Sequence, residues 1–201
     1  MVTVSVPDTT ANVGPGFDTL GLALALYNTL TFEELAEGLY FEGVDPEYAT
    51  AENLAVVAYK AVLSKLGLPM PGLRISEQAE IPSCRGLGSS AALIAAGAAG
   101  ANANHGSPLT RAELLAVCND IEGHPDNLAP AIFGGLVASF VENERPYIAR
   151  YSLHKRLRCT ALIPDFQLST HLARGVLPKE VPYGDAIFNV SRTAVLLRAL
   201  E

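Results

Sequence analysis

The amino-acid sequence predicts a mixed α+β fold, because segments with the period of a β-strand alternate with segments with the period of an α-helix. Between residues 20 and 32 the leucines fall on alternate positions, which predicts a long strand covered on both faces. Residues 81–96 begin as a glycine-rich loop and continue as an alanine-rich helix. Three polar segments, at residues 9–18, 81–90 and 122–135, separate these elements and are the candidate functional sites.

The composition favours a globular protein with a small-molecule ligand. Of the 201 residues, 49% are hydrophobic, which is enough for a substantial core. A net charge of −7 argues against nucleic acid or an anionic membrane as partner, because such binding depends on clustered Lys and Arg. Cys84, Cys118 and Cys159 are widely spaced and form no C-x-x-C motif, which indicates a reducing compartment. With neither a leader pattern nor a membrane-length apolar run, we expect a cytoplasmic protein.

The first half of the chain is expected to contain three strands and two helices. Residues 3–6 predict a short strand ended by Pro7 and Asp8, and a turn follows at residues 9–18. After the strand at 20–32, apolar residues recur at helical spacing over residues 52–66, and Gly67 ends that helix. Residues 73–75 predict a strand that leads into the glycine-rich loop, and residues 89–103 predict the helix behind it.

The second half begins with a capping box. Thr110 and Glu113 have its spacing and predict a helix that ends at Glu122. A polar loop follows at 122–135, then strands at 136–141 and 146–153. The basic segment 155–158 is interpreted as a linker before a strand at 159–163, and residues 185–200 predict an amphipathic helix.

The glycine-rich loop has the properties of an anion site. A loop that enters a helix directly presents free backbone N–H groups and the positive end of the helix dipole at one place, which suits phosphate. Gly86 and Gly88 allow close approach of the backbone, and Ser89 and Ser90 add hydroxyls. The segment is not a P-loop, because no lysine precedes Ser89, and G-x-G-x-x-G does not fit either. The alternative is a helix whose small residues only permit close packing.

Four segments resemble a known family. Gly-Leu-Gly-Ser-Ser-Ala at 86–91 resembles the signature of the GHMP small-molecule kinases, although Cys84 stands where a smaller residue is usual. Residues 7–24 are similar to the P-x-x-x-A-N-x-G-P-G-F-D-x-L-G-x-A-L pattern of the homoserine kinases. Residues 122–135 resemble E-G-H-x-D-N-x-A-P-A-x-x-G-G, and residues 169–178 resemble S-T-x-x-A-R-x-x-L-P, both from that branch.

The resemblance implies a fold and an activity. The fold would be that of the GHMP kinases: an N-terminal ATP-binding domain at 1–154, with a βαβ arrangement like domain 2 of ribosomal protein S5, and the beginning of a ferredoxin-like C-terminal domain at 155–201. The chain would be a C-terminally shortened member. The implied reaction transfers the γ-phosphate of ATP to the hydroxyl of L-homoserine, giving O-phospho-L-homoserine in threonine biosynthesis, with Mg²⁺ as the metal ion.

The resemblance also assigns residues. Ser90 and Glu122 would hold Mg²⁺, Asp18 the ammonium of the acceptor, Arg174 and Asn12 its carboxylate, and Asn127 its hydroxyl. Thr170 completes the substrate-binding residues, and Glu122, Asn127, Asp126 and Arg174 form the catalytic set. The residues expected to contact ATP are Asn53, Pro82, Ser83, Cys84, Arg85, Gly86, Leu87, Gly88, Ser89, Ser90, Ala91 and Ala92.

Several alternatives stay open on the sequence alone. Asp126 is either a catalytic base or a residue of a site that works by positioning, and His124 is expected to hold the loop. Asn53 is either near the adenine or only a first-turn helix residue. Another GHMP kinase, such as a mevalonate-type enzyme, is the nearest rival, and an inactive nucleotide-binding or assembly fragment is the rival from a different class. A homodimer is compatible with the resemblance, but the sequence does not give the oligomeric state.

Overall fold

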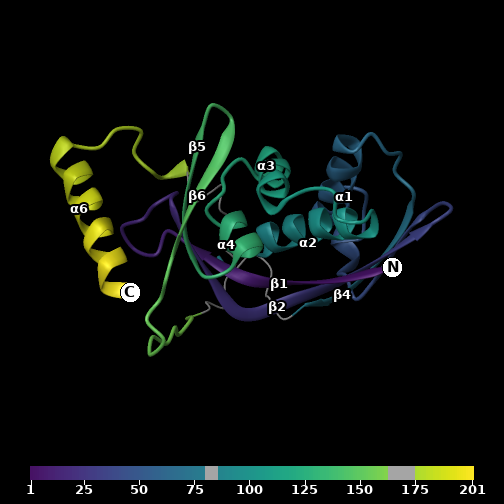
Figure 1. Ribbon diagram of the computed structural model, residues 1–201, viewed down its shortest axis with the longest axis horizontal. Helices are drawn as coiled ribbons and strands as arrows, with labels where there is room; N and C mark the ends of the chain where they lie inside the picture. Colours follow the sequence, from purple (N-terminus) through teal and green to yellow (C-terminus); the bar gives the residue numbers. More distant parts are fainter. Residues whose placement is uncertain (80–85, 163–174) are drawn as a thin grey trace.

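The computed structural model describes residues 1–79, 86–162 and 175–201 and has the mixed α+β architecture that the sequence predicts (Figure 1). The strands are β1 (Val2–Ala11), β2 (Leu20–Leu35), β3 (Leu39–Glu42), β4 (Gly72–Ala79), β5 (Leu136–Glu142) and β6 (Arg145–Tyr151). The helices are α1 (Leu54–Lys65), α2 (Ser89–Asn104), α3 (Arg111–Glu122), α4 (Leu128–Phe133) and α6 (Tyr183–Leu200), with the 3-10 helix η1 (Pro46–Tyr48). Within these ranges, no helix has the length and apolar character needed to cross a membrane.

Strand β2 organises the sheet, because three other strands pair with it. Strand β1 runs antiparallel along one side, from Val2 opposite Phe32 to Ala11 opposite Gly21. On the other side, the second half of β2 pairs with β4 and its first three residues pair with β5. The order is β3-β4-β2-β5-β6, with β1 beside β2. The 16-residue β2 therefore connects the part of the sheet formed with β4 to the part formed with β5.

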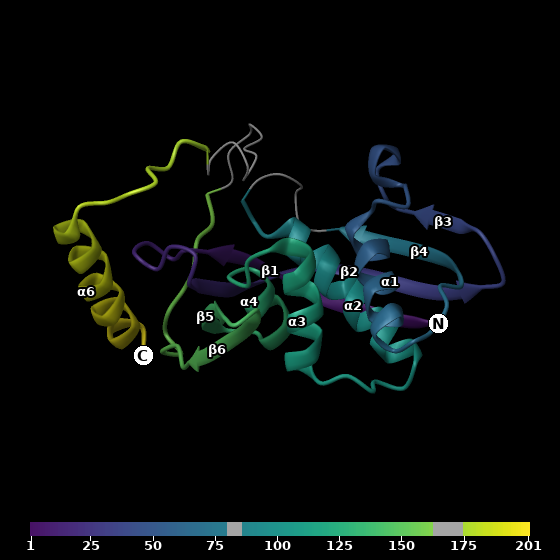
Figure 2. The same ribbon diagram turned by 90° about the horizontal axis from the view of Figure 1, so that it is seen from above.

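The core lies between the sheet and helices α1 to α4, which cover one of its faces (Figures 1 and 2). Two rows of alternating side chains reach it from the strands, and they are fully buried: Leu30 and Phe32 on β2, and Leu73 and Ile75 on β4. This alternation is the strand period recognised in the sequence. The side that carries these rows is called the helix-covered face below.

Helix α2 packs unusually close to its neighbours because it is built from alanine and glycine. A Cβ on Gly97 would lie 2.1 Å from the backbone oxygen of Ala55 in α1, and a Cβ on Gly100 would lie 2.5 Å from the ring of Phe32. Real Cβ atoms do not approach other atoms so closely. Close packing, the alternative reading of the small residues, is therefore correct for this helix whatever its N-terminus binds.

Among the described residues no helix covers the opposite face of the sheet, so the expectation that β2 is covered on both faces is wrong. Ala25 and Tyr27 of β2 are exposed there. Hydroxyl groups pair across β1 and β2 on this face, with 2.9 Å between the Oγ1 atoms of Thr3 and Thr31. Hydroxyl side chains can face water, whereas the leucines on the helix-covered face of β2 are buried by the helices.

Strand β1 is longer than predicted. The sequence places its end at Pro7, but the strand continues to Ala11, with an irregular register between Pro7 and Thr9. Among the described strands, β1 pairs only with β2, so the N–H groups on its other side make no ladder hydrogen bonds. Pro7, which has no N–H, is tolerated in such an edge strand.

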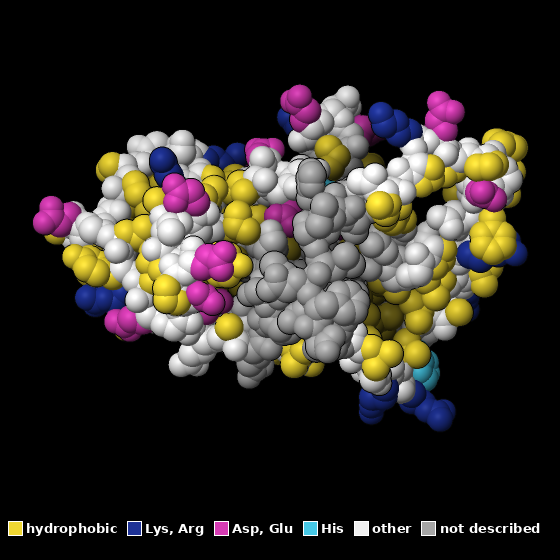
Figure 3. Space-filling model, turned by 180° about the vertical axis from the view of Figure 1, so that it is seen from behind, with side chains coloured by type: hydrophobic (Ala, Val, Ile, Leu, Met, Phe, Trp, Pro, Cys, Tyr) yellow, Lys and Arg dark blue, Asp and Glu magenta, His cyan; other side chains and the backbone are white. Residues whose placement is uncertain are grey.

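The C-terminal part departs further from the prediction. Cys159–Leu162 form no strand, which contradicts the strand expected at 159–163 as far as these residues are described. The final helix is present as α6, but its apolar stripe is uncovered, with Ile187 52% and Val190 72% exposed. Hydrophobic side chains gather at this end of the molecule in Figure 3. The division into domains at residue 154 stays a prediction.

Candidate active site

The described part of the glycine-rich loop is fastened to β1. Gly88 precedes helix α2 with a φ of 68°, in the left-handed region, and a Cβ there would lie 2.0 Å from Oγ1 of Thr9. The N–H of Thr9 donates to the backbone oxygen of Leu87 at 3.3 Å. Only glycine combines this φ with so close an approach to a neighbouring strand. The residues expected at Pro82, Ser83, Cys84 and Arg85 lie outside the described residues.

The start of α2 leaves backbone donors available. No described side chain caps it, and the first helical bond runs from the N–H of Ala92 to the oxygen of Gly88 at 2.9 Å. The N–H groups of the residues between them therefore lack helical partners. The side chains of Leu87, Ala91 and Ala92 are buried in the core, so any contact of these residues with a ligand would come from their backbone.

Ser90 and Glu122, the two residues to which the resemblance assigns Mg²⁺, lie in contact. The hydroxyl of Ser90 donates to Oε2 of Glu122 at 2.7 Å, which joins the first turn of α2 to the last residue of α3. The capping box of Thr110 and Glu113 is formed at the other end of α3. The described residues contain no group of three or more His, Cys, Asp or Glu side chains suited to a metal. A hydroxyl and a carboxylate are hard oxygen ligands, which fit Mg²⁺ when phosphate and water supply the remaining positions.

The segment after α3 combines a polar turn with a helix that the sequence analysis missed. Asp126 is 2% exposed, and its Oδ1 accepts from the N–H of Asn127 at 2.9 Å and lies 2.9 Å from Nδ1 of His124. Its backbone oxygen lies against β2, since a Cβ on Gly21 would come within 1.8 Å of it. Helix α4 then begins at Leu128. The buried position and the two bonds favour a positioning role for Asp126 over that of a base.

Thr9 connects the separate segments, although the sequence analysis did not single it out. It is 1% exposed, and its hydroxyl donates to Oδ1 of Asn127 at 3.0 Å. Its backbone N–H contacts Leu87, so one residue of β1 touches both the glycine-rich loop and the polar turn. These two segments, separated in sequence by more than thirty residues, are therefore brought together at the end of β1.

The turn after β1 is closed by its own amide. Oδ1 of Asn12 accepts from the N–H of Asp18 at 2.9 Å, and both residues have positive φ. Thr193 of α6 donates to the backbone oxygen of Pro15 at 2.9 Å, which brings α6 to this turn. Asn12 and Asp18 are thus held together, as two groups for one ligand require. Thr170 and Arg174 lie outside the described residues, so their roles stay predictions.

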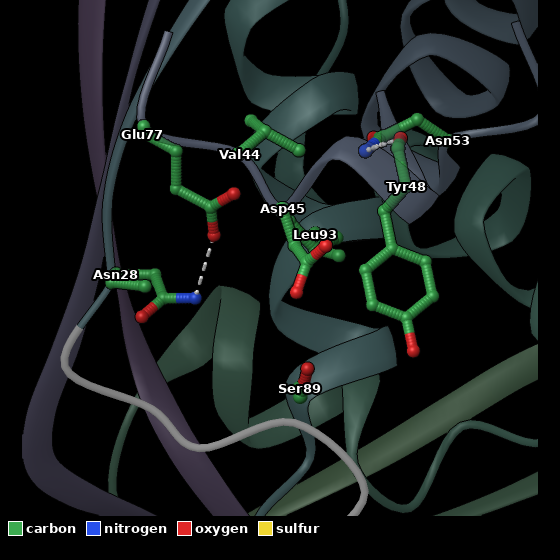
Figure 4. Close-up of a pocket in the computed structure, with 10 residues that line it drawn as sticks. Asn28, Val44, Asp45, Tyr48, Asn53, Glu77, Ser89 and Leu93 are labelled. Carbon is green, nitrogen blue, oxygen red and sulfur yellow. Dashed lines mark hydrogen bonds between the residues drawn. The ribbon is translucent and has the colours of Figure 1, made fainter. Parts of the chain in front are cut away.

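A cavity of about 200 Å³ adjoins the start of α2. Its lining comes from β2, β4, the segment around η1, and α2, and comprises Asn28, Gly43, Val44, Asp45, Tyr48, Asn53, Glu77, Ala79, Ser89 and Leu93 (Figure 4). Asn53 caps α1, because its Oδ1 accepts from the N–H of Ala55 and its Nδ2 donates to the oxygen of Tyr48. Asn53 is therefore the cap of α1 rather than a residue of its first turn, and it also lines the cavity; its contact with adenine stays a prediction.

Asp8 is a buried carboxyl that the sequence analysis read only as a strand end. It is fully buried, Oδ1 accepts from the N–H of Thr9 at 2.6 Å, and Oδ2 has no hydrogen-bond partner among the described residues. Burial raises the pKa of Asp8 to about 6, and the bond from Thr9 opposes that rise. Cys118, on the side of α3 that faces α2, has its pKa raised to about 12 by burial and by Glu122, so it remains a thiol.

Comparisons with known proteins show which family and which fold the chain resembles. The family model of the GHMP kinases N terminal domain matches residues 53–135. A homoserine kinase of Clostridium botulinum is 47% identical over all 201 residues, and the chain spans 68% of that relative's length. The crystal structure of a homoserine kinase from Cytophaga hutchinsonii superposes with a TM-score of 0.84 at 25% identity, over 99% of this chain and 67% of the other. The mevalonate kinase of Methanococcus jannaschii, at 16% identity and a TM-score of 0.59 over 75% of this chain, shares the fold.

Proposed function

Because this chain belongs to the homoserine kinase family of the GHMP kinases, we propose that its three converging segments form the site where ATP phosphorylates the hydroxyl of L-homoserine. The observation that carries the proposal is the 2.7 Å bond between Ser90 and Glu122 at the start of α2. It places a hydroxyl and a carboxylate beside backbone N–H groups that have no helical partner. A triphosphate and its metal ion need these groups together.

On the nucleotide side, the backbone N–H groups of residues 86–91 bind the phosphate oxygens, and the dipole of the 16-residue α2 adds a positive end. Ser90 and Glu122 hold Mg²⁺, which supplies the neutralisation of charge on the β- and γ-phosphates. The cavity beside Ser89 receives the nucleoside, so the adenine lies near Asn53.

On the acceptor side, the turn after β1 and the polar turn provide the contacts. Asp18 pairs with the ammonium, and Asn12 and Arg174 bind the carboxylate, with Thr170 beside them. Asn127 is oriented through its Oδ1, which accepts from Thr9, and its amide donors are directed to the reacting oxygens. The planar fork of an arginine suits a carboxylate.

The transfer forms a bond between the homoserine oxygen and the γ-phosphorus and breaks the bond from that phosphorus to the bridging oxygen, which leaves with ADP. Phosphoryl transfer depends mainly on positioning and charge neutralisation. Asp126 serves by holding His124 and the N–H of Asn127, and the hydroxyl proton passes to phosphate or water. The product, O-phospho-L-homoserine, belongs to threonine biosynthesis, and a cytoplasmic location fits these small-molecule substrates.

A coupled assay of ADP release tests the proposal. Release of ADP should depend on both L-homoserine and Mg²⁺ and be far lower with mevalonate, and we expect only weak transfer by this chain, which spans 68% of its relative's length. A chain that phosphorylates mevalonate and not homoserine would contradict the assigned acceptor. ATP binding without any acceptor-dependent release would identify a nucleotide-binding fragment instead.

A further inference from the structure

Glu77 breaks the apolar pattern of strand β4 at the cavity. Leu73 and Ile75 point from β4 into the core, and Glu77 has the same parity, so it continues their row on the helix-covered face. A carboxylate at an inward position is costly unless it is paired or hydrogen-bonded. Such departures from the hydrophobic pattern concentrate at functional sites.

Asn28 makes the same departure on β2. It continues the buried row of Leu30 and Phe32 and is only 2% exposed. Its Nδ2 donates to Oε1 of Glu77 at 3.2 Å, so two polar residues on adjacent strands are bonded where two apolar rows end. This bond fixes the carboxylate at the wall of the cavity (Figure 4).

The carboxylate of Glu77 retains acceptor capacity. Asn28 engages one oxygen, and no ion pair among the described residues includes Glu77. Burial raises the pKa of Glu77, which reflects the lack of a compensating cation. A half-buried carboxylate of this kind can accept a further hydrogen bond from a donor of a ligand in the cavity.

The cavity places that ligand. Ser89, the first residue of α2, lines it together with Glu77, and Figure 4 shows both side chains facing the same space. A nucleotide with its phosphates at the start of α2 would therefore extend its nucleoside toward Glu77. At about 200 Å³ the cavity is smaller than the ~300–1,000 Å³ of typical ligand sites, which suits one part of a nucleoside.

We propose that Glu77, held by Asn28, accepts a hydrogen bond from a donor group of the nucleoside and so selects the nucleotide of the kinase. This inference rests on the proposed function, because it takes ATP as the ligand. The nucleoside offers two kinds of donor, the ribose hydroxyls and the exocyclic amine of adenine. Carboxylates elsewhere accept from ribose hydroxyls in this manner.

The test compares dissociation constants, measured by calorimetry with Mg²⁺, for ATP, 2′-deoxy-ATP, 3′-deoxy-ATP, N6,N6-dimethyl-ATP and inorganic tripolyphosphate. The unaltered chain should bind ATP about tenfold more tightly than the analogue that lacks the relevant donor, as expected for a bond to a charged group. The analogue that binds more weakly shows whether a ribose hydroxyl or the adenine amine donates the hydrogen bond to Glu77. Glu77→Met should bind ATP as weakly as that analogue, and Glu142→Gln, an exposed carboxylate on β5, should resemble the unaltered chain.

Binding of tripolyphosphate distinguishes a failure of the Glu77 contact from a failure of the phosphate site at the start of α2. It should bind equally to the unaltered chain and to Glu77→Met, because it reaches only the start of α2. If Glu77→Met keeps the unaltered ratios among the nucleotides, the role of Glu77 is refuted while the phosphate site stands. If neither ATP nor tripolyphosphate binds the unaltered chain, the proposed function fails as well. Glu77→Gln, which retains the bond from Asn28, applies the same criterion if the Met variant does not fold.

Discussion

The buried carboxyl of Asp8 allows a quantitative test of the structure. Its pKa is raised from 3.8 to about 6 by burial, so the folded chain holds a proton that the unfolded chain releases between these values. The proton on Asp8 therefore contributes to the free energy of unfolding. This contribution is fully present below pH 3.8 and is lost as the pH rises through about 6. A rise of about 2.2 pKa units corresponds to about 3 kcal/mol.

Asp8→Asn removes this titration and keeps the shape of the side chain. The amide oxygen can still accept from the N–H of Thr9, so the variant isolates the charge. The free energy of unfolding of Asp8→Asn minus that of the unaltered chain should rise by about 2.4 kcal/mol from pH 4 to pH 7, since the unfolded carboxyl is already partly ionised at pH 4. Urea unfolding followed by circular dichroism at intervals across this range measures the difference, and all other titrations cancel in it.

A matched control is Asp120→Asn, an exposed aspartate on α3. As a surface substitution, it should change the free energy of unfolding by no more than about 0.5 kcal/mol. A difference for Asp8→Asn that is equally flat would refute the reasoning, because it would mean that Asp8 is solvated or paired in solution.

Three further variants test the site. Gly88→Ala should lower the free energy of unfolding by about 2–4 kcal/mol in urea titrations. Gly86→Ala is the control, because Gly86 has a similar positive φ but open space around it, and it should lose only about 1 kcal/mol. Equal losses in the two variants would refute the contact of Gly88 with Thr9. Ser90→Ala should weaken the Mg²⁺-dependent affinity for ATP by about 10–100-fold in calorimetry, and an unchanged Mg²⁺ dependence would exclude it as a ligand. Asp126→Asn should reduce kcat by less than about tenfold in the ADP-release assay, while a loss of ~10²–10⁴-fold would identify it as the base.

The regular elements with strong periodicity could be predicted from the sequence. The alternating leucines of β2, the capping box of α3 and the alanine-rich α2 all appear where expected. Pro7 was misread as a strand end, because a sequence does not reveal that a strand lies at an edge. Helix α4 was missed because Pro130 suggests a loop, yet proline is tolerated in a first turn, where the N–H has no helical partner.

Within the site, the pairing of Ser90 with Glu122 followed from the resemblance, and the structure brings them together. The role of Thr9 could not be predicted, because its contact with Asn127 joins residues 118 positions apart. Glu77 was foreseeable in part, since it continues the alternate positions of Leu73 and Ile75 with a charged residue. What periodicity cannot give is that a cavity lies at that point.

The close packing of α2 has a mechanical consequence. Gly97 and Gly100 lie roughly 12 and 16 Å along the helix from Ser89, at 1.5 Å per residue, and there the helix rests on backbone and ring with no side chain between. The direction of the helix, and with it the position of the proposed phosphate-binding end, is therefore fixed in part by contacts far from that end. A methyl group added at Gly97 or Gly100 would tilt α2, and the displacement would be largest at the proposed ATP site, far from the change itself.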